Sequence, residues 1–223
     1  MTLIAFDVYG TLVDPARMVD QLAAPFGARA TAAAQLWREK QLEFTFRRAL
    51  MRRYADFDVC TAQALSYVSG QMGIRLEEET RAALLDAYLR LPSFADVERC
   101  LAALSGAGYK LVALSNGTER AVRALLTCAG IETYFATILS ADTVKTFKPD
   151  PAVYALLQPV AERADQCAWL VSANPFDVIG AKAYGLKAAW LQRDPARSFD
   201  PWEFSPDLVI GSLEELPGKL AAN

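Results

Sequence analysis

The chain has 223 residues, of which 53% are hydrophobic, and its formal net charge is −3. This length fits one α/β domain or a core domain with a smaller inserted one. The mixed charges lack the basic surface expected of a nucleic-acid-binding protein. The sequence contains no histidine, which excludes Ser-His-Asp and Cys-His catalysis and removes the commonest zinc ligand. We therefore expect any chemistry to use carboxylates, lysine, arginine and hydroxyl groups.

The sequence also predicts where the protein resides. No apolar run reaches the roughly 20 residues of a membrane span. The N-terminus MTLIAFDVYG lacks the basic region and cleavage site of a signal peptide, so we expect it to form a first strand. The cysteines have no metal-binding spacing and are expected to be small buried hydrophobic residues of a reducing compartment, hence the cytoplasm: Cys60, Cys100, Cys128 and Cys167. One cationic cluster is expected on a solvated helix face: Arg47, Arg48, Arg52 and Arg53.

Short apolar runs alternate with helical patterns along most of the chain. The predicted strands are Leu3–Val8, Leu111–Leu114, Thr137–Leu139, Ala168–Val171, Ala188–Leu191 and Leu208–Ile210. The predicted helices between them lie near Ala121–Ala129, Ala152–Ala161 and Phe176–Tyr184. This alternation predicts an α/β fold with a doubly wound, mostly parallel, Rossmann-like sheet. The active site of such a sheet lies beyond the carboxyl ends of its strands.

A long helical segment follows the first predicted strand. Apolar and charged residues recur at helical spacing in three ranges: Ala32–Met51, Ala62–Met72 and Glu77–Leu91. The sequence Leu91-Pro92-Ser93-Phe94 then ends the pattern. We therefore predict a helical cap domain at residues 15–91, inserted into a core domain formed by residues 1–14 and 92–223.

Four polar loops are expected to converge at one edge of the sheet, because parallel strands end there together. They are Asp7-Val8-Tyr9-Gly10-Thr11-Leu12, Ser115-Asn116, Lys148-Pro149-Asp150, and Ser172-Ala173-Asn174-Pro175-Phe176-Asp177. Asp7 ends a predicted strand, and Gly10 permits a sharp turn after it. In the third loop Lys145 competes with Lys148 for the same role, and the following Pro149 favours Lys148. The other three loops have purely structural alternatives. Asp7, Thr11, Asn174 and Asp177 could cap helices, and Ser115 and Asn116 could be ordinary turn residues.

In their order, these loops resemble the four motifs of the haloacid dehalogenase superfamily, with Asp7 and Thr11 in the first, then Ser115, Lys148 and Asp177. Two departures from the superfamily's phosphatases indicate the L-2-haloacid dehalogenase subfamily. Tyr9 replaces the general-acid aspartate of phosphatases, which a halide leaving as a stable anion does not need. Ser172 and Asn174 occupy the start of the fourth motif, where phosphatases carry acids that help to hold Mg²⁺. The resemblance therefore implies no metal and no cofactor.

The predicted cap resembles that subfamily as well. The segment Trp37-Arg38-Glu39-Lys40-Gln41-Leu42-Glu43-Phe44 is similar to its cap helix, in which Arg38 would receive the substrate. Arg53-Tyr54-Ala55-Asp56-Phe57 is similar to a segment that places Phe57 at the wall of the apolar pocket. Phe176 stands where the subfamily often has tryptophan, which implies a halide pocket of different size. Tyr154, six residues after Lys148, also fits the subfamily's pattern. The structural alternatives are a solvated charge for Arg38 and core packing for Phe57 and Tyr154.

The resemblance implies a reaction in two steps. Asp7 attacks C2 of a small (S)-2-haloacid, and water activated by Asp177 and placed by Ser172 and Asn174 then hydrolyses the ester to an (R)-2-hydroxy acid. The expected catalytic residues are Asp7, Thr11, Arg38, Ser115, Lys148, Tyr154, Ser172, Asn174 and Asp177. The expected substrate-binding residues are Val8, Tyr9, Arg38, Leu42, Phe57, Ser115, Asn116 and Phe176. The implied partners are the 2-haloacid, water, halide and a second copy in a homodimer, with no nucleic acid and no membrane.

Two other functions are compatible with the same loops. A small-molecule phosphatase with a degenerate metal site would share Asp7, Ser115 and Lys148, and its activity would depend on magnesium. A non-catalytic binding protein built on the same fold would not need its polar loops to act together. The full set of four loops favours an enzyme over the binding protein.

Overall fold

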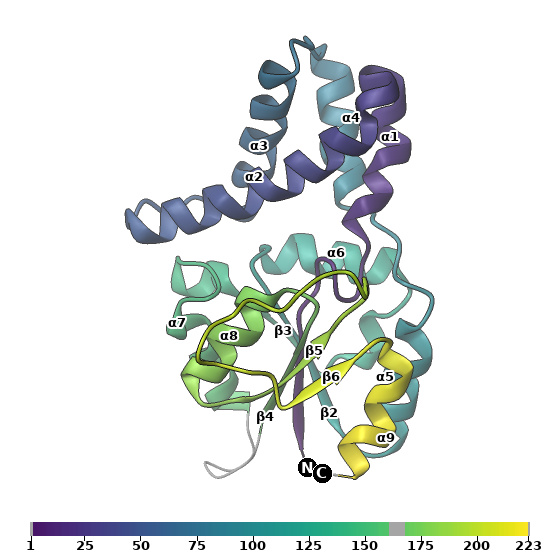
Figure 1. Ribbon diagram of the computed structural model, residues 1–223, viewed down its shortest axis with the longest axis vertical. Helices are drawn as coiled ribbons and strands as arrows, with labels where there is room; N and C mark the ends of the chain where they lie inside the picture. Colours follow the sequence, from purple (N-terminus) through teal and green to yellow (C-terminus); the bar gives the residue numbers. More distant parts are fainter. Residues whose placement is uncertain (1, 161–167, 223) are drawn as a thin grey trace.

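The computed structural model describes residues 2–160 and 168–222 and contains a six-stranded sheet. Its strands are β1 (Leu3–Phe6), β2 (Lys110–Ser115), β3 (Thr137–Ser140), β4 (Ala168–Ser172), β5 (Lys187–Leu191) and β6 (Leu208–Ile210). They lie in the order β3-β2-β1-β4-β5-β6, and each neighbouring pair is parallel (Figure 1). This is the strand order of a doubly wound Rossmann sheet, so the predicted fold class is confirmed.

The first strand is shorter than the predicted Leu3–Val8 but lies in the middle of the sheet. All four of its residues are fully buried, as expected of a strand covered on both faces. It ends at Phe6 because the chain then turns, and the Val8 carbonyl accepts the amides of three residues in that turn: Thr11, Leu12 and Val13. The register pairs Phe6 with Ala113 of β2 and with Val171 of β4. Asp7 therefore lies between the ends of these two strands.

Helices cover both faces of the sheet. They are α5 (Val97–Gly106), α6 (Glu119–Cys128), α7 (Pro151–Tyr154), α8 (Pro175–Tyr184) and α9 (Leu216–Ala221). Successive residues of a strand point to opposite faces. Ile4 and Phe6 accordingly belong to one apolar cluster together with residues of α5, α6 and α9, whereas Leu3 and Ala5 belong to a second cluster with residues of α7 and α8.

One predicted helix of the core is much shorter in the structure. The range Ala152–Ala161 becomes α7 followed by a 3-10 helix at Ala155–Val160, and Ala161 lies outside the described residues. Pro159 lies inside the 3-10 segment, where it cannot donate a backbone hydrogen bond. The helix α5 was absent from the sequence-based prediction. Its buried side is an ordinary apolar stripe of Val97, Leu101 and Leu104.

Four helices stand over the carboxyl ends of the strands (Figure 1). They are α1 (Met18–Phe26), α2 (Ala30–Leu50), α3 (Phe57–Gln71) and α4 (Glu78–Tyr88). The helix α3 begins five residues before the predicted Ala62, because Asp56 caps it by accepting a hydrogen bond from the amide of Val59 at 2.8 Å. The long helix α2 crosses above the sheet and carries Arg38.

The cysteines only partly match the expectation of burial. Cys60 and Cys100 are buried free thiols, and Cys167 lies outside the described residues. Cys128 is exposed at the end of α6, because it lies off the buried stripe formed by Val122 and Leu125. Among the residues that the structure describes, no helix is both long and apolar enough to cross a membrane.

Candidate active site

The Asp7 carboxylate is held by four hydrogen-bond donors. Its Oδ2 atom accepts from Thr11 Oγ1 at 2.8 Å, Asn174 Nδ2 at 2.8 Å and Ser172 Oγ at 3.2 Å. Its Oδ1 atom accepts from Lys148 Nζ at 3.1 Å. The side chain of Asp7 nevertheless retains 9% exposure. The four donors therefore fix the orientation of a carboxylate that a small molecule can still approach.

A tight turn brings Thr11 back to Asp7. Gly10 has a φ angle of +86°, a left-handed conformation that favours glycine. The Thr11 hydroxyl donates to Asp7 and accepts from the amide of Ala173 at 2.9 Å, so it also joins the first loop to the loop after β4. Asn174 makes a similar link, because its side-chain amide donates both to Asp7 and to the Tyr9 carbonyl, at 3.1 Å.

Lys148 joins two carboxylates in the interior. It is 1% exposed, and its Nζ lies 3.1 Å from Asp7 Oδ1 and 2.8 Å from Asp177 Oδ2. Burial by itself would lower the pKa of Lys148, but Asp177 and Asp7 more than offset that effect, so the pKa lies above its ordinary value. The lysine therefore remains a cation between the two acids. Its backbone amide donates to Asn116 Oδ1 at 2.9 Å.

Asp177 is completely buried at the far end of this ion-pair network. Burial raises the pKa of Asp177 to about 6, although the nearby Lys148 opposes the shift. The Tyr154 hydroxyl donates to Asp177 Oδ1 at 2.9 Å, and burial raises the pKa of Tyr154, which therefore keeps its proton. This contact depends on Gly180, because a Cβ atom there would lie only 2.4 Å from the Tyr154 hydroxyl oxygen.

Arg38 reaches the first loop from α2. Its Nη2 donates to the Tyr9 carbonyl at 3.3 Å, and its Nη1 donates to Gln41 Oε1 at 2.7 Å. Gln41 is completely buried and also accepts from the Tyr88 hydroxyl at 2.9 Å. Neither supporting residue was predicted from the sequence. Gln41 lies three positions after Arg38 on the same helix, which could have indicated the contact, whereas Tyr88 comes from α4 and left no local signal.

Aromatic rings form an apolar wall beside these polar groups. The Tyr9 ring lies between Phe57, at a centroid distance of 5.1 Å, and Tyr88, at 5.9 Å. Burial raises the pKa of Tyr9, so its phenol stays neutral. Phe176 packs edge-on against Phe46 of α2 at 5.1 Å, so it also contacts the helices above the sheet.

A family model described as haloacid dehalogenase-like hydrolase matches residues 1–185. The chain belongs to this family. An (S)-2-haloacid dehalogenase of Xanthobacter autotrophicus is 40% identical over 236 residues, covering 96% of this chain and 92% of the relative. Another from Pseudomonas sp. strain YL is 38% identical over 210 residues, covering 94% and 90%.

A solved structure gives the same result. The L-2-haloacid dehalogenase from Xanthobacter autotrophicus with chloropropionic acid covalently bound superposes with a TM-score of 0.92 at 32% identity, covering 99% of this chain and 98% of that one. The predicted membership of the haloacid dehalogenase superfamily, and of its L-2-haloacid dehalogenase subfamily, is therefore confirmed.

In this haloacid dehalogenase-like hydrolase, the second loop is hydrogen-bonded to the backbone of Lys148. The Ser115 hydroxyl accepts from the amide of Gly117 at 3.1 Å and makes no hydrogen bond to Asp7 within the described residues. The Asn116 side chain holds the Lys148 backbone. The structure thus brings this loop to the site, while the expected roles of Ser115 and Asn116 toward substrate stay predictions.

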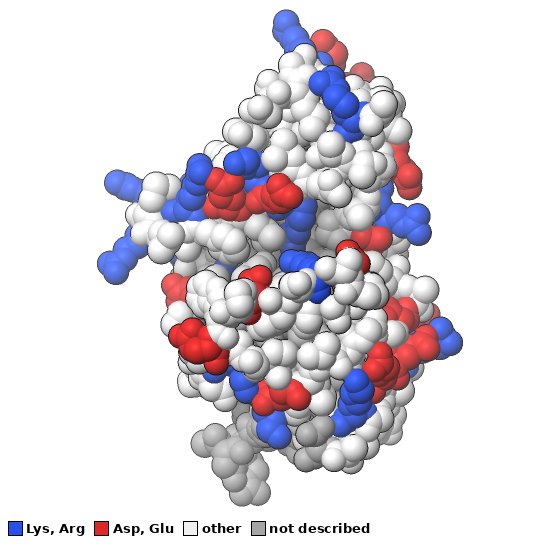
Figure 2. Space-filling view, in the orientation of Figure 1, with Lys and Arg blue, Asp and Glu red and all other residues white. Residues whose placement is uncertain are grey.

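A cavity of about 530 Å³ lies between helices α1 and α2 and the loops that follow strands of the sheet. Gly10, Arg38, Leu42 and Asn174 are among the residues that line it, and Leu42 is half-buried there. Figure 2 shows Lys and Arg side chains in the hollow between the helical part and the sheet part. Asp7 is not among the residues that line this cavity, but Asn174, which donates to Asp7, lines it together with Arg38.

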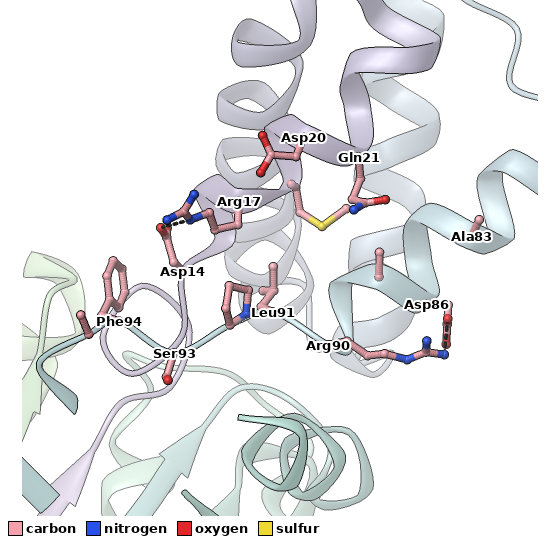
Figure 3. Close-up of a pocket in the computed structure, with 14 residues that line it drawn as sticks. Asp14, Arg17, Asp20, Gln21, Ala83, Asp86, Arg90, Leu91, Ser93 and Phe94 are labelled. Atoms are coloured by element: carbon pink, nitrogen blue, oxygen red, sulfur yellow. Dashed lines mark hydrogen bonds and ion pairs between the residues drawn. The ribbon is translucent and has the colours of Figure 1, made fainter. Parts of the chain in front are cut away.

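A larger cavity, of about 950 Å³, lies away from this chemistry (Figure 3). It is lined by residues of α1, α4 and the chain segment that follows α4. Its charged side chains largely neutralise one another, since Arg17 pairs with Asp14 at 3.8 Å and Arg90 pairs with Asp86. None of the predicted site residues lines it, so it is not the candidate active site.

Proposed function

We propose that the protein is an (S)-2-haloacid dehalogenase, which converts small (S)-2-haloacids to (R)-2-hydroxy acids through an ester on Asp7. One observation carries the proposal. Asp7 is fixed by four donors, one of which is a buried lysine shared with a second carboxylate, Asp177. Relatives of this name match nearly the whole chain.

The geometry suggests which oxygen of Asp7 attacks. Among the described residues, Oδ2 already accepts three hydrogen bonds, whereas Oδ1 accepts one, from Lys148. We therefore propose that Oδ1 forms the new bond to C2 while the carbon–halogen bond breaks in line and both bonding electrons leave with the halide. The amides of Val8 and Tyr9 make no hydrogen bond to another described residue, which supports a role in holding the substrate carboxylate. Arg38 would stabilise the departing halide.

The second step uses the other oxygen. When Oδ1 is esterified, Oδ2 becomes the carbonyl oxygen of the ester. Thr11, Ser172 and Asn174, which already donate to Oδ2, would stabilise the negative charge that develops there as water attacks. Asp177 would take a proton from that water and give it to Oδ1 as the bond between Oδ1 and the Asp7 carboxyl carbon breaks, which releases the hydroxy acid. The Asp7 carboxyl group would then lose the remaining water proton to solvent and return to a carboxylate.

We propose that neither step needs a metal or cofactor. The Lys148 ammonium occupies the position between Asp7 and Asp177, and Ser172 and Asn174 present hydrogen-bond donors to Asp7. In the part of the chain that the structure describes, no group of three or more Cys, Asp or Glu residues is placed to hold a metal ion. Nothing in this arrangement favours the phosphatase alternative.

Halide release from the separate enantiomers of 2-chloropropanoate tests this function. We expect release from the (S) enantiomer and not from the (R) enantiomer, with equal rates before and after treatment with EDTA. Phosphate release from phosphate monoesters serves as the control for the alternative function. Loss of activity in EDTA that added Mg²⁺ restores would contradict the proposed metal independence.

The raised pKa of Asp177 predicts how the rate depends on pH. Its folded pKa, about 6, lies above the ordinary value of 3.8 because of burial. The protonated, inactive base therefore accumulates as the pH falls through 6, and we expect ester hydrolysis to slow there.

Tyr154→Phe removes a hydrogen bond that favours the ionised form of Asp177. The loss of rate at low pH should therefore begin at a higher pH in this variant than in the wild type. Single-turnover rates measured between about pH 4.5 and 8 would give the acidic limb of the pH profile for the wild type and for Tyr154→Phe. Identical acidic limbs in the two proteins would contradict the assignment of Asp177 as the base.

We also propose the assembly, the location and the division into domains. The protein would be a cytoplasmic homodimer, with a core of residues 1–14 and 92–223 and a cap of residues 15–91. Leu50 and Met51, at the end of α2, are 86% and 61% exposed, and such apolar side chains support an interface there. The cap would exclude bulk water from Asp7 during the first step.

A further inference from the structure

The two chain connections between the sheet and the helices above it are paired with each other. The amide of Asp14 donates to the Pro92 carbonyl at 3.0 Å, and the amide of Phe94 donates to the Leu12 carbonyl at 3.0 Å. Val13 and Ser93 form an antiparallel bridge between them. Any movement of the helices relative to the sheet must pass through this pair, called here the hinge ribbon (residues 12–14 and 92–94).

Arg193, in the loop after β5, contacts one segment of the hinge ribbon and the residue that precedes the other segment. Its Nη2 donates to the Thr11 carbonyl at 2.6 Å, next to the first connection. Its guanidinium lies 3.6 Å from the centroid of the Phe94 ring, in the second connection. Both Nη atoms also donate to Asp96 at 3.2 Å, just beyond Phe94. One side chain therefore joins three chain segments at the base of the helices.

The partner of Arg193 in the ion pair, Asp96, is itself held by other hydrogen bonds. Asp96 additionally accepts from the Ser212 hydroxyl at 3.0 Å and the Leu213 amide at 2.9 Å, so it is held by the C-terminal part of the chain. The Arg193 and Asp96 side chains are only 19% and 13% exposed. Because little of either side chain is exposed to water, this bidentate pair is stronger and more directional than an exposed ion pair.

Thr11 connects this anchor to the nucleophile. Its carbonyl accepts from Arg193, while its hydroxyl donates to Asp7 Oδ2 at 2.8 Å. A shift of Thr11 would therefore move one of the three donors on the oxygen that is proposed to become the ester carbonyl. Catalysis is sensitive to such shifts, because misplacement by about 1 Å can cost about 10²-fold in rate.

We propose that Arg193 is a positioning residue, which keeps Thr11 and hence Asp7 in place by clamping the first loop to the hinge ribbon. This inference rests on the proposed dehalogenase function. Arginine suits the role because its planar fork reaches Asp96 and Thr11 together while its face lies on Phe94. The lysine ammonium is a point charge that cannot reproduce all three contacts.

Arg193→Gln and Arg193→Lys test the proposal in the full-length protein, with (S)-2-chloropropanoate as substrate. We expect kcat to fall about tenfold in Arg193→Gln and less in Arg193→Lys. KM should change by less than about twofold, because Arg193 lines the 530 Å³ cavity but its guanidinium is engaged by Thr11, Phe94 and Asp96. With enzyme in excess, the single-turnover rate constant should fall as much as kcat. Arg99→Gln is the matched control, because it removes an exposed ion pair with Glu214 in the same region.

A double-mutant cycle separates positioning from general stabilisation. If Arg193 acts through Thr11, Arg193→Gln should have little further effect on the rate constant in a Thr11→Val background. Additive effects, or a lowered Tm with an unchanged single-turnover rate constant, would overturn the proposal, as would unchanged kcat in both Arg193 variants. Wild-type protein that releases no halide would instead overturn the proposed function, and this inference with it.

Discussion

Asp7→Asn is expected to abolish halide release, to below about 10⁻⁴ of the wild-type rate, a loss typical of removing a nucleophile. An amide is a poor nucleophile, and its NH₂ group would face one of the donors that now hold the carboxylate, such as Lys148 or Thr11. Ion chromatography of the reaction with (S)-2-chloropropanoate would measure the loss. Asp20→Asn is a suitable control, since Asp20 is exposed on α1 and lines the larger cavity away from Asp7.

Isotope labelling tests whether Asp7 forms a covalent bond. In a single turnover in ¹⁸O-water, we expect the label in the Asp7 carboxylate, because water attacks the ester carbonyl and the product hydroxyl oxygen comes from Asp7. Mass spectrometry of the Asp7 peptide and of the product would locate it. Label found only in the product would mean that water attacks C2 directly, and the proposed ester would then be wrong.

Asp177→Asn is expected to slow hydrolysis of the ester more than its formation. Removal of a positioned base typically costs on the order of 10²–10⁴ in rate, and this base is needed only after the halide has left. The variant should release up to one halide per site in a burst and accumulate an adduct on Asp7. Rapid-quench measurement of halide, with mass spectrometry of the Asp7 peptide, would detect both.

The structure adds a second consequence of this substitution. Asp177 Oδ2 lies 2.8 Å from Lys148 Nζ, which also holds Asp7, so we expect the burst itself to be slower than in the wild type. Tyr154→Phe provides the matched comparison, because it removes a hydrogen bond from Asp177 without touching Lys148. A folded Asp177→Asn protein with neither burst nor adduct would refute the division of work between Asp7 and Asp177.

The local pattern of the sequence was sufficient for much of the fold. Alternating strand and helix patterns predicted the parallel sheet, because each pattern depends only on spacing within one segment. The same reasoning placed Asp7, Lys148 and Asn174 at strand ends or in the loops that follow them, and these residues do meet in the structure. The prediction was poorer where tertiary context decides, as in the range Ala152–Ala161, most of which forms a 3-10 helix.

Residues that act through distant partners could be found only in the structure. The sequence shows Arg38 as a charge on a helix. Its partner Gln41 is in turn hydrogen-bonded by Tyr88, and that contact depends on how α4 packs against α2. The need for glycine at position 180 becomes clear only when Tyr154 is seen to lie against it. The role proposed for Arg193 likewise depends on the loop after β5 lying beside the hinge ribbon. By itself the sequence determined which side chains end each strand, since that follows from local spacing. The tertiary structure decided which of them touch, because the strand order and the helix packing join segments up to 182 positions apart.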